Sequence, residues 1–140
     1  MKKRISIVLC LTMILAMCFG MVACGKKAPT EPTTVSMVSG QTYGSGNTSF
    51  AFSVTDTDGK ETAVTVKTDK DTVGAALLDL GLVVGEDSEY GLYVTTVNGT
   101  TLDYEKDGKY WAFYINGEYA MTGVDATPVE DGASYSFVAE

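Results

Sequence analysis

The sequence predicts an α+β domain with a β-grasp-like mixed sheet, in which β-hairpins accompany one short crossing helix. Two observations carry this prediction. Several short stretches alternate between apolar and polar residues, which is typical of half-buried strands, and one stretch around Leu77 has apolar residues at helical spacing instead. The prediction applies to residues 50–140, and about ninety residues allow one core of limited size.

The first predicted element is a hairpin, and a helix follows it. Residues 50–54 and 63–67 alternate with period two, and the segment 55–60 between them carries Gly59, which accepts the positive φ of a tight turn. Residues 73–80 place their apolar side chains on one face of a helix. Asp71 or Thr72 is suited to cap this helix and Gly81 to end it.

Four more strands are predicted after the helix. Residues 92–97 end at the turn signal Asn98-Gly99, and residues 109–115 end at the same signal, Asn116-Gly117. The stretches 119–121 and 134–138 complete the sheet.

The first 23 residues have the layout of a lipoprotein signal peptide. Three basic residues at positions 2–4 precede an apolar run from residue 5 to residue 22. The ending Met21-Val22-Ala23-Cys24 resembles the bacterial lipobox, although that family usually has Leu where Met21 stands. We therefore expect a mature protein that is lipidated (palmitate included) on Cys24 and anchored at the extracytoplasmic face of a bacterial cell membrane. A retained transmembrane anchor and plain secretion are the alternatives.

Residues 24–49 are predicted to be a flexible linker behind the lipidated cysteine. Pro, Thr, Ser and Gly dominate this segment, and no apolar periodicity is visible. Such a composition buries too little apolar surface to become ordered. The predicted domain boundaries are thus 1–23, 24–49 and 50–140.

The residue inventory excludes several classes of function. The chain has no His, and its Cys residues lie in the predicted signal peptide or at the lipidation site, which excludes catalytic triads, Cys–His dyads and His- or Cys-based metal sites. Ten basic and 18 acidic residues, with three of the basic ones in the signal peptide, leave seven against 18, a net charge of −11 that would repel nucleic acid. Every carboxylate lies beside a turn or on the predicted helix, so we expect no catalytic residue and no enzyme.

The chain from Val64 onward resembles the C-terminal β-domain of transcobalamin and intrinsic factor, and in particular bacterial lipoproteins that carry this domain alone. The motifs that carry the resemblance are Thr72–Leu77, Tyr90–Val94 leading to Val97-Asn98-Gly99, Lys109–Gly117, Gly123-Val124-Asp125 and Asp131-Gly132.

The resemblance implies that the ligand is cobalamin or another corrinoid, with no covalently required cofactor. In the two-domain cobalamin carriers, the β-domain covers the corrinoid from one side, through stretches that align here with Glu89–Val94 and Trp111–Ala120. Tyr90 stands where those carriers tend to have Trp. The helical partner domain is missing, so a helical partner protein or a transporter is expected to complete the site. The candidate ligand-binding residues are Glu89, Tyr90, Gly91, Leu92, Tyr93, Val94, Tyr110, Trp111, Tyr114, Asn116 and Gly117.

Alternation along residues 110–115 leaves the role of the aromatic residues open. Trp111 shares one sheet face with Phe113, whereas Tyr110 and Tyr114 share the other, and one of these faces must be core. Trp111 is therefore either a core residue or a ligand contact, and Tyr110 and Tyr114 are the fallback contacts. Asn116-Gly117 also fits a plain turn.

Two further functions fit the sequence. An exposed aromatic face would equally suit a surface module that binds another protein or the cell wall. A weak divalent-metal site is the other, in the acidic turns 86–89 and 103–108. The loop that begins at Asp56 lacks the glutamate that a calcium-binding loop has at its twelfth position, so we predict a hairpin tip there and assign no metal ligand.

Overall fold

The computed structural model describes residues 34–140 of the chain. The predicted signal peptide, Cys24 and residues 24–33 of the predicted linker lie outside the described residues. Between residues 34 and 140, no helix is long and apolar enough to cross a membrane. The elements are, in chain order, β1 (Thr42–Gly44), β2 (Thr48–Thr55), β3 (Glu61–Thr68), α2 (Val73–Asp79), β4 (Val83–Ser88), β5 (Gly91–Val97), β6 (Thr100–Thr101), α3 (Tyr104–Asp107), β7 (Trp111–Ile115), β8 (Glu118–Tyr119), the 3₁₀ helix η1 (Val124–Ala126) and β9 (Ser134–Ala139).

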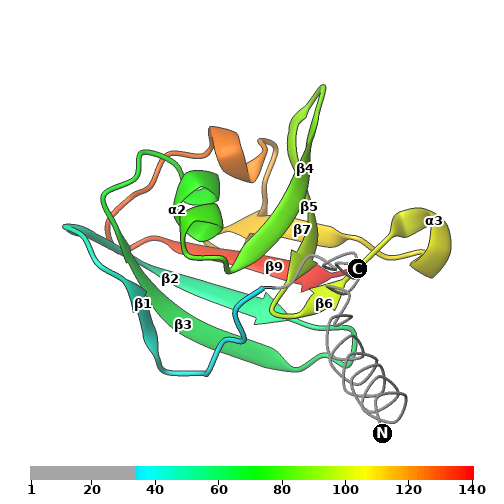
Figure 1. The fold of residues 1–140 in the computed structure, drawn as a ribbon, viewed down its shortest axis with the longest axis horizontal. Helices are drawn as coiled ribbons and strands as arrows, with labels where there is room; N and C mark the ends of the chain where they lie inside the picture. The colour runs from blue at the N-terminus through cyan, green and yellow to red at the C-terminus, as the bar shows by residue number, and fades with distance from the viewer. Residues whose placement is uncertain (1–33) are drawn as a thin grey trace, which may run out of the picture. The chain divides into compact units, whose positions relative to one another are not determined.

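The larger sheet has six strands in the order β1-β3-β2-β9-β7-β8 (Figure 1). β2 and β3 form an antiparallel hairpin, and β9 runs parallel to β2 in the middle of the sheet. β1 is parallel to β3, and β7 is antiparallel to both β9 and β8. The α+β prediction with a mixed sheet is confirmed, and the central pairing of an early strand with a late one is the β-grasp feature that the sequence suggested.

The β2–β3 hairpin forms because apolar side chains alternate along both strands. Phe50, Phe52 and Val54 are buried on the same face, opposite Val64 and Val66 of β3. The tip is held by the Asp56 carboxylate, whose Oδ1 accepts hydrogen bonds from the N–H groups of residues 58 and 60, at 2.9 and 3.0 Å. The predicted hairpin tip is confirmed.

Helix α2 covers one face of the larger sheet, as its apolar stripe requires (Figure 1). Thr72 is the N-cap, and its hydroxyl oxygen accepts a hydrogen bond from Ala75 N at 3.2 Å. Val73, Ala76 and Leu77 are fully buried against the sheet. Of the two caps that the sequence allowed, the structure uses Thr72.

A second sheet of three strands, β4-β5-β6, packs on the same side as α2. The sequence predicted β5, but it placed an acidic turn at residues 86–89. Glu86, Asp87 and Ser88 instead belong to β4 and pair with β5, so this prediction was wrong. The strand forms because Val83 at its start is buried in the core and fixes the register. The β4–β5 hairpin projects as an arm beyond the rest of the fold (Figure 1).

Both Asn-Gly signals form tight turns, as predicted. Asn98 and Asn116 have φ of 48° and 50°, and the glycines after them have φ of 80° and 82°. Positive φ at both central residues is characteristic of the type I′ turn, the two-residue hairpin turn whose twist matches that of the flanking strands.

The predicted linker boundary at residue 49 lies too far along the chain. Residues 34–49 pack on the domain: Val35 N donates to Gly81 O at 2.8 Å, and Met37, only 7 % exposed, donates its N–H to Asn98 Oδ1 at 2.8 Å. β1 then pairs with the edge of β3. Composition misled here because one buried methionine and backbone pairing along a sheet edge order a segment that has almost no apolar periodicity.

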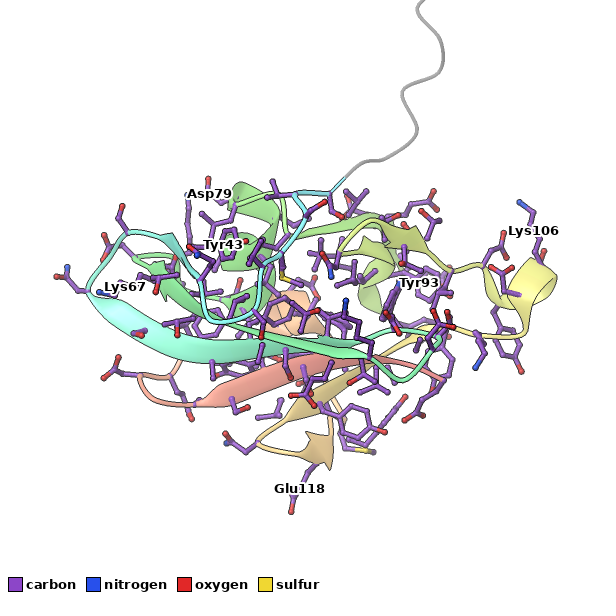
Figure 2. The ribbon with its side chains drawn as sticks, turned by 90° about the horizontal axis from the view of Figure 1, so that it is seen from below. Tyr43, Lys67, Asp79, Tyr93, Lys106 and Glu118 are labelled. Carbon is purple, nitrogen blue, oxygen red and sulfur yellow. The ribbon has the colours of Figure 1, made fainter. Side chains whose placement is uncertain are left out.

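The two faces of the larger sheet differ. The face toward α2 and the smaller sheet carries the apolar core, whereas no element of residues 34–140 packs over the other face (Figures 1 and 2). In Figure 2, Tyr93 of the arm lies on the α2 side, and Glu118 points away from the body at the β7–β8 turn. At the β7–β8 end, the larger sheet therefore has one face toward the core and one face that no other element covers.

Candidate ligand-binding site

The two stretches that the sequence singled out meet around one hollow of about 320 Å³, which we call the aromatic hollow. One wall is the arm, and the other is the β7–β8 hairpin with the loop before η1. It is lined by Tyr90, Leu92, Tyr93, Val94, Tyr110, Trp111, Phe113, Tyr119, Ala120, Thr122, Gly123, Val124 and Phe137. Segments distant in sequence thus converge on a mainly apolar cavity.

Trp111 forms part of the floor of the aromatic hollow. It is 5 % exposed, and its indole N–H donates to Thr100 O at 3.2 Å, which ties β7 to β6. Phe113 beside it packs against Phe137 with ring centroids 5.2 Å apart. Trp111 is therefore a core residue whose surface borders the hollow, which reconciles the two readings that the sequence left open.

The rim of the aromatic hollow exposes large side chains. Tyr90 at the tip of the arm is 91 % exposed, and Tyr93 is 42 % exposed. Ser88 fixes the tip because its hydroxyl donates to Gly91 O at 2.6 Å and accepts from Tyr90 N at 3.2 Å. A rigid tip with an exposed ring is a suitable contact for a flat ligand.

Asp125 in η1 lies close against both the arm and the loop before η1, a position that the sequence analysis did not assign. A Cβ on either Gly91 or Gly123 would lie 2.7 Å from Asp125 Oδ1. Gly74 of α2 allows η1 an equally close approach, because a Cβ there would lie 2.7 Å from Asp125 Cα. The Gly-Val-Asp motif at residues 123–125 was the sequence signal for this close approach. Its glycine is explained because a side chain at Gly123 would meet the Asp125 carboxylate.

Several of the predicted contact residues do not reach the aromatic hollow. Asn116 lies in the turn, where its Oδ1 accepts a hydrogen bond from Ser134 N at 2.9 Å, and Gly117 completes that turn. Glu89 is exposed at the arm tip and does not line the cavity. Tyr114 lies on the opposite face of the sheet, paired across the hairpin with Tyr119.

The structure brings in lining residues that the sequence analysis missed. Thr122, Gly123 and Val124 reach the hollow through the loop before η1, and Phe137 reaches it from β9. Of these, only Gly123 and Val124 had a sequence signal, the Gly-Val-Asp motif. Phe137 appeared only as an apolar position in an alternating strand.

Tyr110 has the most perturbed pKa near the site. Its hydroxyl oxygen is 3.4 Å from that of Tyr119. The hydrogen bond to Tyr119, with a smaller contribution from desolvation, raises the pKa of Tyr110 to about 12. The Tyr110 phenol is therefore neutral at physiological pH.

A larger hollow of about 610 Å³ lies on the other side of Tyr93 and carries carboxylates from β4 and from the segment around α3. Asp103 caps α3, accepting from Glu105 N at 3.0 Å, and contacts Lys106 Nζ at 3.2 Å. The hydrogen bond from Lys106 holds the pKa of Asp103 below its usual value. Within residues 34–140, no three His, Cys, Asp or Glu side chains are grouped as a metal ion requires. We therefore place the candidate site in the aromatic hollow.

Comparison with known proteins finds one described family and two solved structures of similar fold. Residues 70–136 match the family described as Domain of unknown function (DUF4430). A solved structure from Ruminococcus gnavus ATCC 29149, described as a candidate metal-binding protein, is similar with a TM-score of 0.64 and 32% identity, over 67% of this chain and 97% of that one. Haptocorrin in complex with Cbi is similar in fold, with a TM-score of 0.53 and 21% identity over 66% of this chain. The chain spans only 25% of haptocorrin. None of the curated proteins matches in sequence.

Proposed function

The chain belongs to the same family as the Ruminococcus gnavus protein, and from this premise we propose that it is a binding domain whose aromatic hollow receives one face of a corrinoid such as cobalamin. The observation that supports the proposal most is the meeting of the arm and the β7–β8 hairpin around an apolar cavity. The fold likeness to haptocorrin, the complex with Cbi, agrees with it.

The chemistry of the hollow suits such a ligand. A corrin is a flat, partly apolar disc fringed with amides, and apolar cavities with a few polar groups at the rim are typical small-molecule sites. The exposed rings of Tyr90 and Tyr93 offer apolar area, while their hydroxyls and the nearby backbone can meet amides. About 320 Å³ holds only part of such a ligand, so a partner covering the other face fits the proposal.

We place this domain at the extracytoplasmic face of a bacterial membrane, held by a lipid on Cys24. Its role is then capture of the ligand, or delivery to a transporter in the same membrane. No covalent chemistry is involved, and the partner that completes the site is a helical protein or the transporter itself.

The direct test is titration of residues 24–140 carrying Cys24→Ser with cobalamin and with Cbi. Trp111 is the only tryptophan in the sequence and borders the hollow, so its fluorescence should be quenched as the corrin absorbance changes. Tyr90→Ala should weaken binding about tenfold, because a stacking contact of an exposed aromatic ring is worth about 1 kcal/mol or more. The variant should be as stable as the parent, because Tyr90 is exposed and is not part of the hydrophobic core.

The matched control is Tyr104→Ala, because Tyr104 is also exposed but does not line the aromatic hollow. It should bind as the parent does. Unchanged fluorescence and absorbance at high micromolar ligand would remove the corrinoid from the proposal. Equal loss in both variants would place the ligand elsewhere.

A second candidate function is binding of a divalent cation, which the description of the Ruminococcus gnavus relative favours. The larger hollow is the place to test. Its carboxylates, Glu86, Asp103 and Glu105, are not grouped around one point within residues 34–140, so a bound ion would have to draw them together. A rise in melting temperature with millimolar Ca²⁺ that a chelator reverses, and that Glu86→Gln abolishes, would support it. A melting temperature that does not respond to Ca²⁺ would argue against this candidate.

A further inference from the structure

A cluster of hydroxyl and carboxylate oxygens occupies the open face of the larger sheet, on the side of β7 that the core does not use. Tyr110 and Tyr114 flank Ala112 on this face, and Ala112 is 1 % exposed because side chains cover it. Tyr119 of β8 and Glu140, the residue after β9, complete the group. We call these four side chains the tyrosine cluster.

Strand register brings the side chains of the cluster together as two hydrogen-bonded pairs, Tyr110 with Tyr119 and Tyr114 with Glu140. Tyr114 is paired with Tyr119 across the hairpin, yet the Tyr119 hydroxyl lies 3.4 Å from that of Tyr110, so its ring leans along β7 toward the start of that strand. Glu140 lies opposite Tyr110, joined by backbone hydrogen bonds of 2.9 and 3.1 Å. The Tyr114 hydroxyl nevertheless donates to the Glu140 carboxylate, so Tyr114 leans the same way.

Packing holds these side chains in place. The rings of Tyr114 and Tyr119 meet edge to face with centroids 5.7 Å apart, and Tyr104 of α3 meets the ring of Tyr110 at 6.3 Å. Three phenols and one carboxylate are thus preorganised on a rigid sheet rather than on loops. Among the salt bridges of residues 34–140, none involves Glu140, so its charge is not neutralised by a Lys or Arg.

We propose that the tyrosine cluster is a binding site for a hard trivalent cation of the ferric type, with the three phenolate oxygens and the Glu140 carboxylate as ligands. Hard cations prefer anionic oxygen donors, and a trivalent ion is acidic enough to displace phenol protons. Each phenol that binds releases one proton to water, and the metal keeps its oxidation state. Tyr110 and Tyr119 also line the aromatic hollow, whereas Tyr114 and Glu140 do not, so the two proposed sites adjoin and share these two tyrosines.

The test is addition of ferric nitrilotriacetate to residues 24–140 carrying Cys24→Ser. Binding at the cluster should produce a tyrosinate-to-iron charge-transfer band in the visible, with one equivalent at saturation. The double variant Tyr114→Phe/Tyr119→Phe keeps both rings and should lose the band, and Glu140→Gln should weaken binding at least tenfold. Tyr90→Phe, outside the cluster, is the control and should keep the band.

The absence of a visible band in the parent chain would overturn the inference, and so would a band of equal strength in the double variant. Trp111 fluorescence and far-UV circular dichroism check that the phenylalanine variants are folded. Cobalamin titration of Glu140→Gln separates the two proposals, because Glu140 does not line the aromatic hollow. Weaker iron binding in this variant should leave corrinoid binding unchanged, and failure of corrinoid binding in the parent chain should leave the iron band intact.

Discussion

The two faces of strand β7 have the same length and nearly the same aromatic content but different surroundings. On one face Trp111 and Phe113 are packed under the arm and the smaller sheet and form the floor of the aromatic hollow. On the other face Tyr110 and Tyr114 flank Ala112, and their rings meet single side chains, Tyr104 and Tyr119, and not a packed layer. Residues 110–114 thus supply the floor of one candidate site and two of the four ligands of the other.

The difference shows what strand alternation determines. Period two assigns each side chain to a face, but it does not say which face another layer covers. Coverage comes from α2 and from β4–β6, which all pack on one side (Figure 1). Hydroxyls remain on the uncovered face, where they can hydrogen bond to one another and to water.

The largest expected difference between the faces is in stability. Phe113→Ala should lower the free energy of unfolding by about 3–5 kcal/mol, because it leaves a cavity beside Phe137. Tyr114→Ala, one residue later, should cost about 1 kcal/mol, since it loses mainly a hydrogen bond at the surface. Urea unfolding followed by Trp111 fluorescence measures both. Equal losses of unfolding free energy in the two variants would contradict the assignment of one face as covered and the other as uncovered.

A smaller effect is expected at the glycines that border each surface. Gly91→Ala, in the wall of the aromatic hollow, should cost about 1–3 kcal/mol, because φ is +102° and the new methyl group would meet Asp125 Oδ1. Gly117→Ala, at φ +82° with open space around it, should cost only about 1 kcal/mol. Thermal or urea unfolding gives both values.

The second half of this comparison is a double-mutant cycle. In an Asp125→Ala background, Gly91→Ala should become less costly because the clash is relieved while the φ penalty stays. A cost that is independent of Asp125 would show that the arm is not held by this contact.

The smallest effect concerns the titration of the tyrosine cluster. Tyr119→Phe should lower the pKa of Tyr110 from about 12 toward 10, because it removes the hydrogen bond that raises it. Tyrosinate absorbance followed through alkaline pH measures this. Because the pKa is raised in the folded state, the stabilisation is complete below about pH 10 and is lost as the pH rises toward 12. A pKa of Tyr110 unchanged by Tyr119→Phe would contradict the assignment of the hydrogen bond.

The sequence predicted most of the fold because its local signals were strong and agreed with each other. Alternation around Phe52, the cap at Thr72 and the two Asn-Gly turns each lie where the structure has them. β4 was missed because its second half is acidic and exposed, and only its pairing with β5 makes it a strand. β1 was missed because a short edge strand needs a partner more than it needs apolar residues.

The sequence analysis identified only part of the candidate site, because some lining residues are brought there by the tertiary fold alone. The resemblance pointed to the arm and to the β7–β8 hairpin, and the structure brings both to one hollow. Thr122 and Phe137 were not found because lining residues of this kind depend on how the loop before η1 folds back over β9. Asn116 does not line the hollow, and its amide oxygen accepts a hydrogen bond from Ser134 N of the neighbouring strand β9 instead.

The parallel pairing of β2 with β9 has a consequence for how the molecule forms. Ser49 N donates to Asp131 Oδ1 across 82 residues, and the central ladder begins beside that contact. A ladder between such distant segments must close a long loop before it gains any stabilisation, which makes folding slow. Until residues 134–139 are available, the β2–β3 hairpin keeps an unpaired edge. A chaperone that shields a bare strand edge would therefore act during this interval.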